Sequence, residues 1–137
     1  MEHTTLLLIK PNATAKNKIG EIIKMVEDHG FVIDRLKIFR FDTELGRQFY
    51  AIHAEKPFFS RLIDFMTSGK TVAVVVHRDN AVAFLRKLVG NTDHTQAAPG
   101  TIRHLYGESI TMNAVHASDS PENAVREIGL IFPEESK

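Results

Sequence analysis

The chain has 137 residues, of which 43% are hydrophobic and 25% charged, values typical of one globular domain. It contains no cysteine, which excludes disulfides and thiolate metal sites and is typical of a cytoplasmic protein. Seventeen basic and 17 acidic residues leave no net charge, which argues against nonspecific nucleic-acid binding. We therefore expect a single cytoplasmic domain over 1–137 without membrane contact, since the first apolar run is too short for a signal peptide or a span.

The first half of the chain predicts two strands and three helices. The run TTLLLIK is apolar and precedes Pro11, which is typical of a buried strand. Four aliphatic residues then recur at the i, i+3, i+4 and i+7 spacing of one helix face. The expected elements are a strand at 4–10, a helix from Ile19 to Gly30, a half-exposed strand at 31–41, and short helices at 43–53 and 58–68.

The second half predicts two further strands, each followed by a helix. The β-branched run TVAVVVHR is the clearest buried strand of the chain, and Ser120 followed by Pro121 is a strong helix start. This pattern of elements favours one four-stranded sheet with helices packed on it, without deciding the strand order. The expected elements are a strand at 71–78, a helix at 80–90, a loop at 91–108, a strand at 109–115 and a helix at 121–130.

Two patterns that suggest other sites fail on spacing. The run SGKT at 68–71 resembles the end of a phosphate-binding P-loop, but Asp64 stands where that motif requires glycine, and the order of helix and strand is reversed. The seven histidines are scattered and have no metal-ligand spacing, so we predict no metal site built from protein side chains.

The segment NAVHASDS (113–120) places a histidine between strand-like residues and a helix start. Taken alone, His116 is more often a half-buried histidine beside a helix cap than a reactive group. Two serines and Asp119 follow it and can supply orienting hydrogen bonds, and the helix start favours a nearby anion. A neutral imidazole is a competent nucleophile if one ring nitrogen is free and the other is fixed, and Glu127 could fix it.

Taken together, the motifs of the chain resemble those of the nucleoside diphosphate kinase family. NAVHASDS, followed by a helix that ends in EIG, is similar to the N-x-x-H-G-S-D-S signature of that family. The family order and spacing also match LLLIKP, GEII, FYAIHAEKPFF, SGKTVAVVV, T-x(6)-PGTIR and EIGLIF, which together cover nearly the whole chain. The resemblance implies an α/β (α+β) sandwich of ferredoxin-like topology, with a four-stranded antiparallel sheet.

The resemblance also implies a reaction. The γ-phosphoryl group of a nucleoside or deoxynucleoside triphosphate, chiefly ATP, would pass to a nucleoside diphosphate by a ping-pong route through a phosphohistidine on Nδ1 of His116. Lys10 and Asn113 would reach the sugar 3′-hydroxyl, and Lys10 would help to neutralise the transferring phosphate. The implied catalytic group is His116, Lys10, Glu127, Ser118, Asn113 and Tyr50.

Nucleotide binding would use an apolar slot and a set of cations. In the resemblance, Phe58 stacks on the base between Leu62 and Ile110, and an aromatic face of this kind tolerates every base. Mg²⁺ is the implied cofactor, carried on the nucleotide phosphates rather than by the protein. The implied nucleotide-binding residues are Lys10, Phe58, Leu62, Arg86, Thr92, Arg103, Ile110 and Asn113.

Several positions depart from the family pattern. Ala117 replaces the glycine of the signature and would be strained if that position needed a positive φ, although we expect a small effect. Asp93, His94 and His104 fall in a loop that hexameric members use around their threefold contact. The resemblance therefore implies a homo-oligomer built from dimers, and it leaves tetramer and hexamer open.

Two other functions remain open for the sequence. A catalytically silent relative would bind nucleotides as a regulatory module without forming a phosphoenzyme, although the presence of His116, Lys10 and Glu127 argues against it. A nucleic-acid-binding role would use the aromatic platform and the arginines, but the zero net charge makes nucleic acid an unlikely partner.

Overall fold

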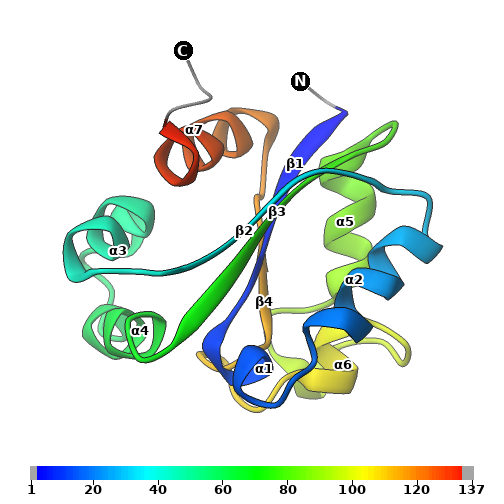
Figure 1. Ribbon diagram of the computed structural model, residues 1–137. Coiled ribbons are helices and arrows are strands. Elements are labelled where there is room, and N and C mark those ends of the chain that lie inside the picture. Colours follow the sequence, from blue (N-terminus) through cyan, green and yellow to red (C-terminus); the bar gives the residue numbers. More distant parts are fainter. Residues whose placement is uncertain (1–2, 134–137) are drawn as a thin grey trace.

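The computed structural model describes residues 3–133, in which four strands alternate with helices (Figure 1). The strands are β1 (Thr4–Ile9), β2 (Val32–Arg40), β3 (Lys70–His77) and β4 (Val115–Ala117). The α-helices are α1 (Pro11–Ala15), α2 (Ile19–Asp28), α3 (Thr43–Phe49), α4 (Phe59–Met66), α5 (Ala81–Val89), α6 (Ile102–Tyr106) and α7 (Pro121–Ile131). Two short 3₁₀ helices lie at Ala51–His53 and His94–Gln96. Within residues 3–133, no helix is long and apolar enough to cross a bilayer.

The four strands form one sheet in the order β2-β3-β1-β4, and every neighbouring pair is antiparallel. This arrangement confirms the predicted four-stranded antiparallel sheet. The central strands β1 and β3 are almost wholly buried, as their continuous apolar runs predict. The outer strand β2 alternates between exposed and partly buried residues, as expected for a strand at the edge of a sheet.

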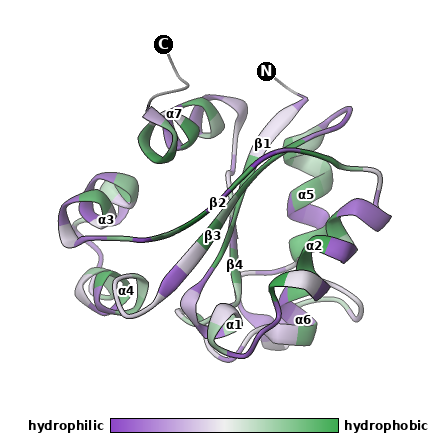
Figure 2. Ribbon diagram, in the orientation of Figure 1, coloured by the Kyte–Doolittle hydropathy of each residue, from purple (hydrophilic) through white to green (hydrophobic). Residues whose placement is uncertain are grey.

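The alternation of side chains along β1 and β3 divides the core into two layers. Leu7, Ile9 and the valines at 72, 74 and 76 face α2, α5 and α6, whereas Leu6 and Leu8 face α3, α4 and α7. Figure 1 shows these two groups of helices on opposite sides of the sheet, and Figure 2 shows hydrophobic residues both on the strands and on the helices of the two groups. Each strand therefore presents one row of side chains to each layer.

The predicted strand at 109–115 is wrong, because β4 spans only Val115–Ala117. The chain before it turns back on itself: the backbone N–H groups of Glu108 and Ser109 both donate to the carbonyl oxygen of Met112, at 2.7 and 3.2 Å. Ala114 then has a φ of 77°, which extended backbone cannot accommodate. His116 consequently lies inside β4 rather than after a strand end. The sequence also predicted neither α1, which lies between the predicted strand at 4–10 and the helix from Ile19, nor α6, which lies in the predicted loop at 91–108.

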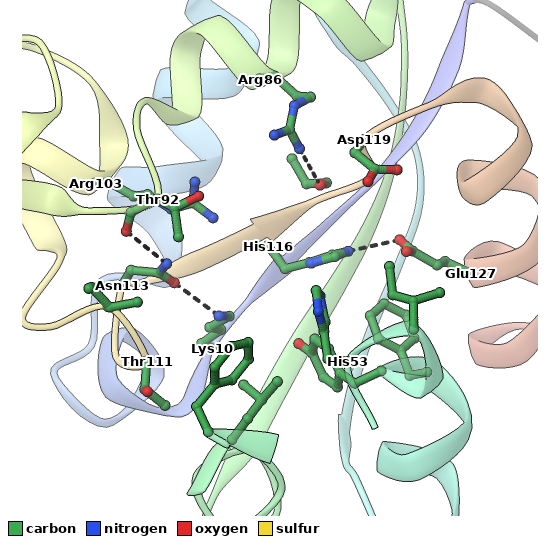
Figure 3. Close-up of a pocket in the computed structure, with 17 residues that line it drawn as sticks. Lys10, His53, Arg86, Thr92, Arg103, Thr111, Asn113, His116, Asp119 and Glu127 are labelled. Atoms are coloured by element: carbon green, nitrogen blue, oxygen red, sulfur yellow. Dashed lines mark hydrogen bonds and ion pairs between the residues drawn. The ribbon is translucent and has the colours of Figure 1, made fainter. Parts of the chain in front are cut away.

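The start of α7 agrees with the sequence pattern. The Ser120 hydroxyl accepts a hydrogen bond from the backbone N–H of Asn123 at 3.0 Å, and Pro121 occupies the first turn. Two turns later the same helix carries Glu127, whose side chain points back toward the sheet (Figure 3). The cap therefore determines where this carboxylate reaches the core.

Candidate active site

A cavity of about 280 Å³ opens beside β4, where the C-terminal end of β1 meets the segments around α3, α4 and α7 (Figure 3). All the residues implied as catalytic or nucleotide-binding line it, except Ser118, which lies behind Glu127. The lining comes from segments distant in the sequence: Lys10, Phe49, Tyr50, Ile52, His53, Phe58, Leu62, Arg86, Thr92, Arg103, Ile110, Thr111, Asn113, His116, Ala117, Asp119 and Glu127.

His116 is held at the base of this cavity by strand register and aromatic packing. It pairs with Leu8 across the β1–β4 ladder, so its side chain lies on the sheet face covered by α3 and α7. The ring packs edge-on against Phe49 at 5.1 Å and Tyr50 at 5.9 Å between ring centroids. The imidazole is thus confined by the core, yet its side chain keeps 21% of its surface exposed.

The orientation of the His116 ring is set by a carboxylate. Nε2 lies 2.8 Å from Oε1 of Glu127, and the Ser118 hydroxyl donates to the same oxygen at 2.7 Å. Because a carboxylate can only accept, this contact selects, in the neutral imidazole, the tautomer with its proton on Nε2 and the lone pair on Nδ1. Of the three polar residues after His116 and Ala117, only Ser118 joins this network, since Asp119 accepts from Asn123 and Ser120 caps α7.

Lys10 enters the cavity from the end of β1. Its Nζ donates to Oδ1 of Asn113 at 2.9 Å, and the Asn113 amide donates in turn to the carbonyl of Thr92 at 3.1 Å. Burial, together with the positive charge of Arg103, lowers the pKa of Lys10 to about 7. Among residues 3–133 Lys10 has no ion-pair partner, and a buried lysine of this kind is poised to bind an anion, because an anion would restore the charged form.

Two arginines bring further positive charge to the same wall. Arg103 donates to the carbonyls of Gly90 and Val115, each at 3.0 Å, and Arg86 donates to that of Ala117 at 3.2 Å. Burial, and then the neighbouring charge of Arg86, lowers the pKa of Arg103 to about 10. In the described part of the chain both guanidinium groups donate to backbone carbonyls and neither forms an ion pair with a carboxylate, although Arg86 is close enough to Asp119 to lower the pKa of that carboxyl.

Three buried polar atoms of the lining have no hydrogen-bond partner among the described residues: Nε of Arg103, the Tyr50 hydroxyl and Nδ1 of His53. Burial, followed by the charge of Glu127, raises the pKa of Tyr50, so its hydroxyl stays protonated and can donate. Unpaired buried polar atoms are rare in folded proteins, and three in one cavity indicate a site completed by a polar ligand.

The opposite end of the cavity is apolar and open to solvent. Phe58 is 40% exposed and Ile110 is 64% exposed, and Leu62 lies below them. Large apolar side chains left exposed on either side of a cavity are suited to a flat, apolar ligand face. The cavity thus joins a cationic end, where His116 lies, to an apolar slot.

Sequence reasoning did not single out His53, Thr111 or Ile52 as site residues, although all three line the cavity. Their signal was weak, because His53 was one of seven scattered histidines and Thr111 fell in a segment predicted as a strand. Burial and neighbouring positive charge lower the pKa of His53, which therefore contributes a mainly neutral imidazole. Among the described residues, no group of three or more histidine or acidic side chains could hold a metal ion.

An imidazole oriented by a carboxylate, a wall of cations and an apolar slot define the class of the protein as a phosphotransferase that acts on nucleotides. The family model described as nucleoside diphosphate kinase matches residues 3–137. The chain belongs to the nucleoside diphosphate kinase family and is a kinase of that kind, which confirms the predicted family and enzyme class.

Relatives and solved structures agree with this assignment. Nucleoside diphosphate kinases of Staphylothermus marinus and Wolinella succinogenes are 47% and 51% identical to the chain over 131 residues each, covering 96% and 93% of it and 93% of each relative. The Aquifex aeolicus enzyme structure aligns with a TM-score of 0.93 at 43% identity, over 95% of this chain and 94% of that one. The structure of a Halobacterium salinarum enzyme in complex with CDP aligns with a TM-score of 0.92 at 38% identity, over 96% of this chain and 88% of that one.

Proposed function

We propose that the kinase works by a ping-pong route through His116. The lone pair of Nδ1 attacks the γ-phosphorus of a triphosphate, chiefly ATP, the bond from that phosphorus to the bridging oxygen breaks, and the nucleoside diphosphate leaves. The reverse attack by a second diphosphate returns the imidazole to its neutral form. The observation that carries this proposal is the 2.8 Å contact between Nε2 and Glu127, which leaves Nδ1 unprotonated at the cationic end of the cavity.

The other site residues have roles that follow from their charge and position. We propose that Lys10, Arg86 and Arg103 bind the phosphates with Thr92, and that Lys10 and Asn113 bind the sugar 3′-hydroxyl. Such cations stabilise the charge that spreads over the transferring group, and little covalent chemistry is asked of them. The protonated Tyr50 hydroxyl beside His116 would donate to the same group.

The apolar slot would hold the base. Phe58 and Ile110 offer their exposed surfaces on either side, with Leu62 beneath, and a platform of this kind discriminates little between bases. A CDP complex of the Halobacterium salinarum relative supports nucleotide diphosphates as ligands here.

We also propose Mg²⁺ as the cofactor, carried on the nucleotide. The cavity lining has only two carboxylates, and one of them, Glu127, is occupied by His116. The donors suited to Mg²⁺ are therefore mainly the phosphate oxygens, where the ion would neutralise charge, and Asp119 is the other carboxylate of the lining that could help to hold it. The chain's own contribution is to hold the phosphates in place.

Labelled nucleotide tests this route directly. Protein incubated with Mg²⁺ and ATP labelled at the γ-phosphate should acquire an acid-labile, alkali-stable label, which GDP discharges and which His116→Ala lacks. The alternative of a silent nucleotide-binding module predicts calorimetric binding of ATP without any label. A His116→Ala variant with near-normal exchange activity would contradict the role of His116.

We further propose that residues 1–137 act in the cytoplasm as one domain that assembles into a homo-oligomer of dimers, with tetramer and hexamer both open. The edge strand β2 supports a dimer, because it exposes Val32, Leu36 and Ile38 at 59%, 47% and 57% on an unpaired edge. Light scattering should give a mass of at least two chains, and Leu36→Lys with Ile38→Lys should lower it. A monomeric wild-type protein would refute this assembly.

A further inference from the structure

A short turn at residues 108–112, which we call the 108–112 turn, carries the apolar lip of the cavity. The N–H groups of Glu108 and Ser109 converge on the carbonyl of Met112, and the N–H of Met112 donates to the Ser109 hydroxyl at 2.9 Å. Ile110 and Thr111 lie between these closures and line the cavity. The position of the lip therefore depends on how the turn is held from outside.

Asn12 holds this turn from the other side of the chain. Its Nδ2 donates to Oε2 of Glu108 at 2.9 Å and to the carbonyl of Met112 at 3.2 Å, so it joins both ends of the turn. The carbonyl of Tyr106 lies at 3.5 Å from the same nitrogen. Because all three partners can only accept, the amide must present its nitrogen to them, and the side chain is 8% exposed.

The helix that carries Asn12 is a rigid support. Thr14 in α1 donates from its hydroxyl to the carbonyl of Lys70 on β3 at 2.8 Å, which ties α1 to the sheet. Lys10, just before α1, binds the far end of the loop: its backbone N–H donates to the carbonyl of Ala114 at 2.8 Å, and its ammonium group donates to Asn113. One short segment thus anchors the lip at Asn12 and the phosphate side at Lys10.

We infer that Asn12 is a positioning residue of the enzyme: through Glu108 and Met112 it sets the place of Ile110 against the base. This inference rests on the proposed base slot of Phe58 and Ile110. Asn12 lies outside the cavity lining, and within residues 3–133 its side chain donates only to Tyr106, Glu108 and Met112. Its loss should therefore weaken binding of the base and leave the chemistry at His116 intact.

The test compares Asn12→Ala with wild type in exchange activity and in calorimetric binding of ADP. A hydrogen-bond pair of this kind corresponds to a loss of about five- to tenfold in affinity, so KM and the ADP dissociation constant should rise by that factor while kcat stays within about twofold. Glu108→Gln, whose amide oxygen can still accept from Asn12 and Lys16, should remain near wild type, whereas Glu108→Ala, which loses both contacts, should lose at least as much affinity as Asn12→Ala.

A double-mutant cycle separates positioning from general loosening. In an Ile110→Ala background, Asn12→Ala should change ADP affinity by less than about twofold, because the side chain through which it acts is gone. Glu21→Ala is the matched control. It removes the 2.6 Å hydrogen bond that the Tyr106 hydroxyl on α6 donates to Glu21 on α2, together with the exposed ion pair between Lys18 and Glu21, without touching the turn, and it should leave KM unchanged.

Three outcomes would overturn the inference: wild-type KM in Asn12→Ala, a loss confined to kcat, or effects of Asn12→Ala and Ile110→Ala that multiply in full. If Asn12→Ala does not fold, the contrast between Glu108→Gln and Glu108→Ala decides the question, since Glu108 is partly exposed. If the proposed phosphohistidine route is wrong, the wild-type protein will acquire no label from γ-labelled ATP. The ADP affinities of the variants would still test the role of Asn12 in that case, because they do not depend on phosphoryl transfer.

Discussion

Leu8 on β1 and His116 on β4 are directly paired across the antiparallel ladder, and both side chains lie on the face covered by α3 and α7. Their neighbours in the ladder, the pairs Leu7–Ala117 and Ile9–Val115, point to the opposite layer. A shift of one residue in this register would move the imidazole to the other side of the sheet, away from Glu127. The reactive geometry therefore depends on the pairing of a three-residue strand.

The contact between His116 and Glu127 predicts a catalytic effect of the carboxylate. Glu127→Ala should slow phosphoenzyme formation by about 10- to 100-fold, because the imidazole loses its orientation and its fixed tautomer. This factor corresponds to the free energy of a hydrogen bond to a charged group. Rapid-quench labelling measures the rate, and ¹⁵N NMR of His116 should change from one tautomer to a mixture. Ser118→Ala, which keeps the contact with Nε2, should have a smaller effect, and an unchanged rate in Glu127→Ala would contradict its orienting role.

The pKa of Lys10 predicts a pH dependence of nucleotide binding. With a pKa of about 7 in the free protein, Lys10 is mostly neutral at pH 8, and phosphate binding must recharge it. Affinity for ADP should therefore fall between pH 7.5 and 9, by at most about tenfold per pH unit, and binding should take up a proton. Calorimetry in buffers of different ionisation enthalpy measures this uptake. Lys10→Met should bind weakly with no such slope, and equal slopes in both proteins would assign the effect elsewhere.

Burial of Lys10 also predicts that its replacement should stabilise the protein and lower its activity. In the folded protein the pKa of Lys10 lies below 10.5, the ordinary value of a lysine, so between about pH 7 and 10.5 the unfolded chain holds more protons. The contribution of Lys10 to the free energy of unfolding therefore rises with pH over this range. Lys10→Met should remove the cost of burying a charge and stabilise the protein by about 1–3 kcal/mol at pH 7 while abolishing most activity. Urea titrations at pH 7 and 9 test this expectation, and a destabilised Lys10→Met would refute it.

The exposed face of Phe58 predicts uniform effects on different bases. Phe58→Ala should weaken the binding of ADP, GDP and CDP by about 10- to 100-fold each, because stacking uses the face that every base shares. Calorimetry with the three diphosphates provides the comparison. A sharp change in base preference would show that Phe58 reads an edge of the base instead.

The backbone around β4 predicts opposite effects for two neighbouring alanines. Ala114 has a φ of 77°. Ala117, which replaces the glycine of the family signature and was therefore the candidate for a strained backbone, lies in the extended strand β4. Ala114→Gly should therefore stabilise the protein by about 0.5 kcal/mol, since the relief of strain exceeds the added freedom of the unfolded chain. Ala117→Gly should destabilise it by about 0.5–1 kcal/mol. Thermal unfolding of both variants measures these values, and effects of the same sign would contradict the strain at Ala114.

Sequence patterns predicted most elements because hydrophobic periodicity is local. β1, β3, α2 and α7 follow from spacings within a dozen residues, and their predicted bounds lie within a few residues of those observed. The segment 109–115 failed because SITMNAV has strand-like composition, while its conformation is decided by hydrogen bonds to Met112 and by Asn12, nearly a hundred residues away. Composition carries no information about such a partner.

By itself, the sequence determined the family, the four-stranded α+β fold and the residue types of the candidate site. Ordered motifs and local hydrophobic periodicity can be recognised without any knowledge of the tertiary contacts. The family resemblance implied Nδ1 as the reactive nitrogen, but only the tertiary structure brought Nε2 of His116 to Glu127 and gave Ala114 rather than Ala117 a positive φ. The tertiary structure also decided that Asn12 holds the lip of the cavity. These features depend on strand register and on hydrogen bonds between distant segments, which exist only once the chain has closed on itself.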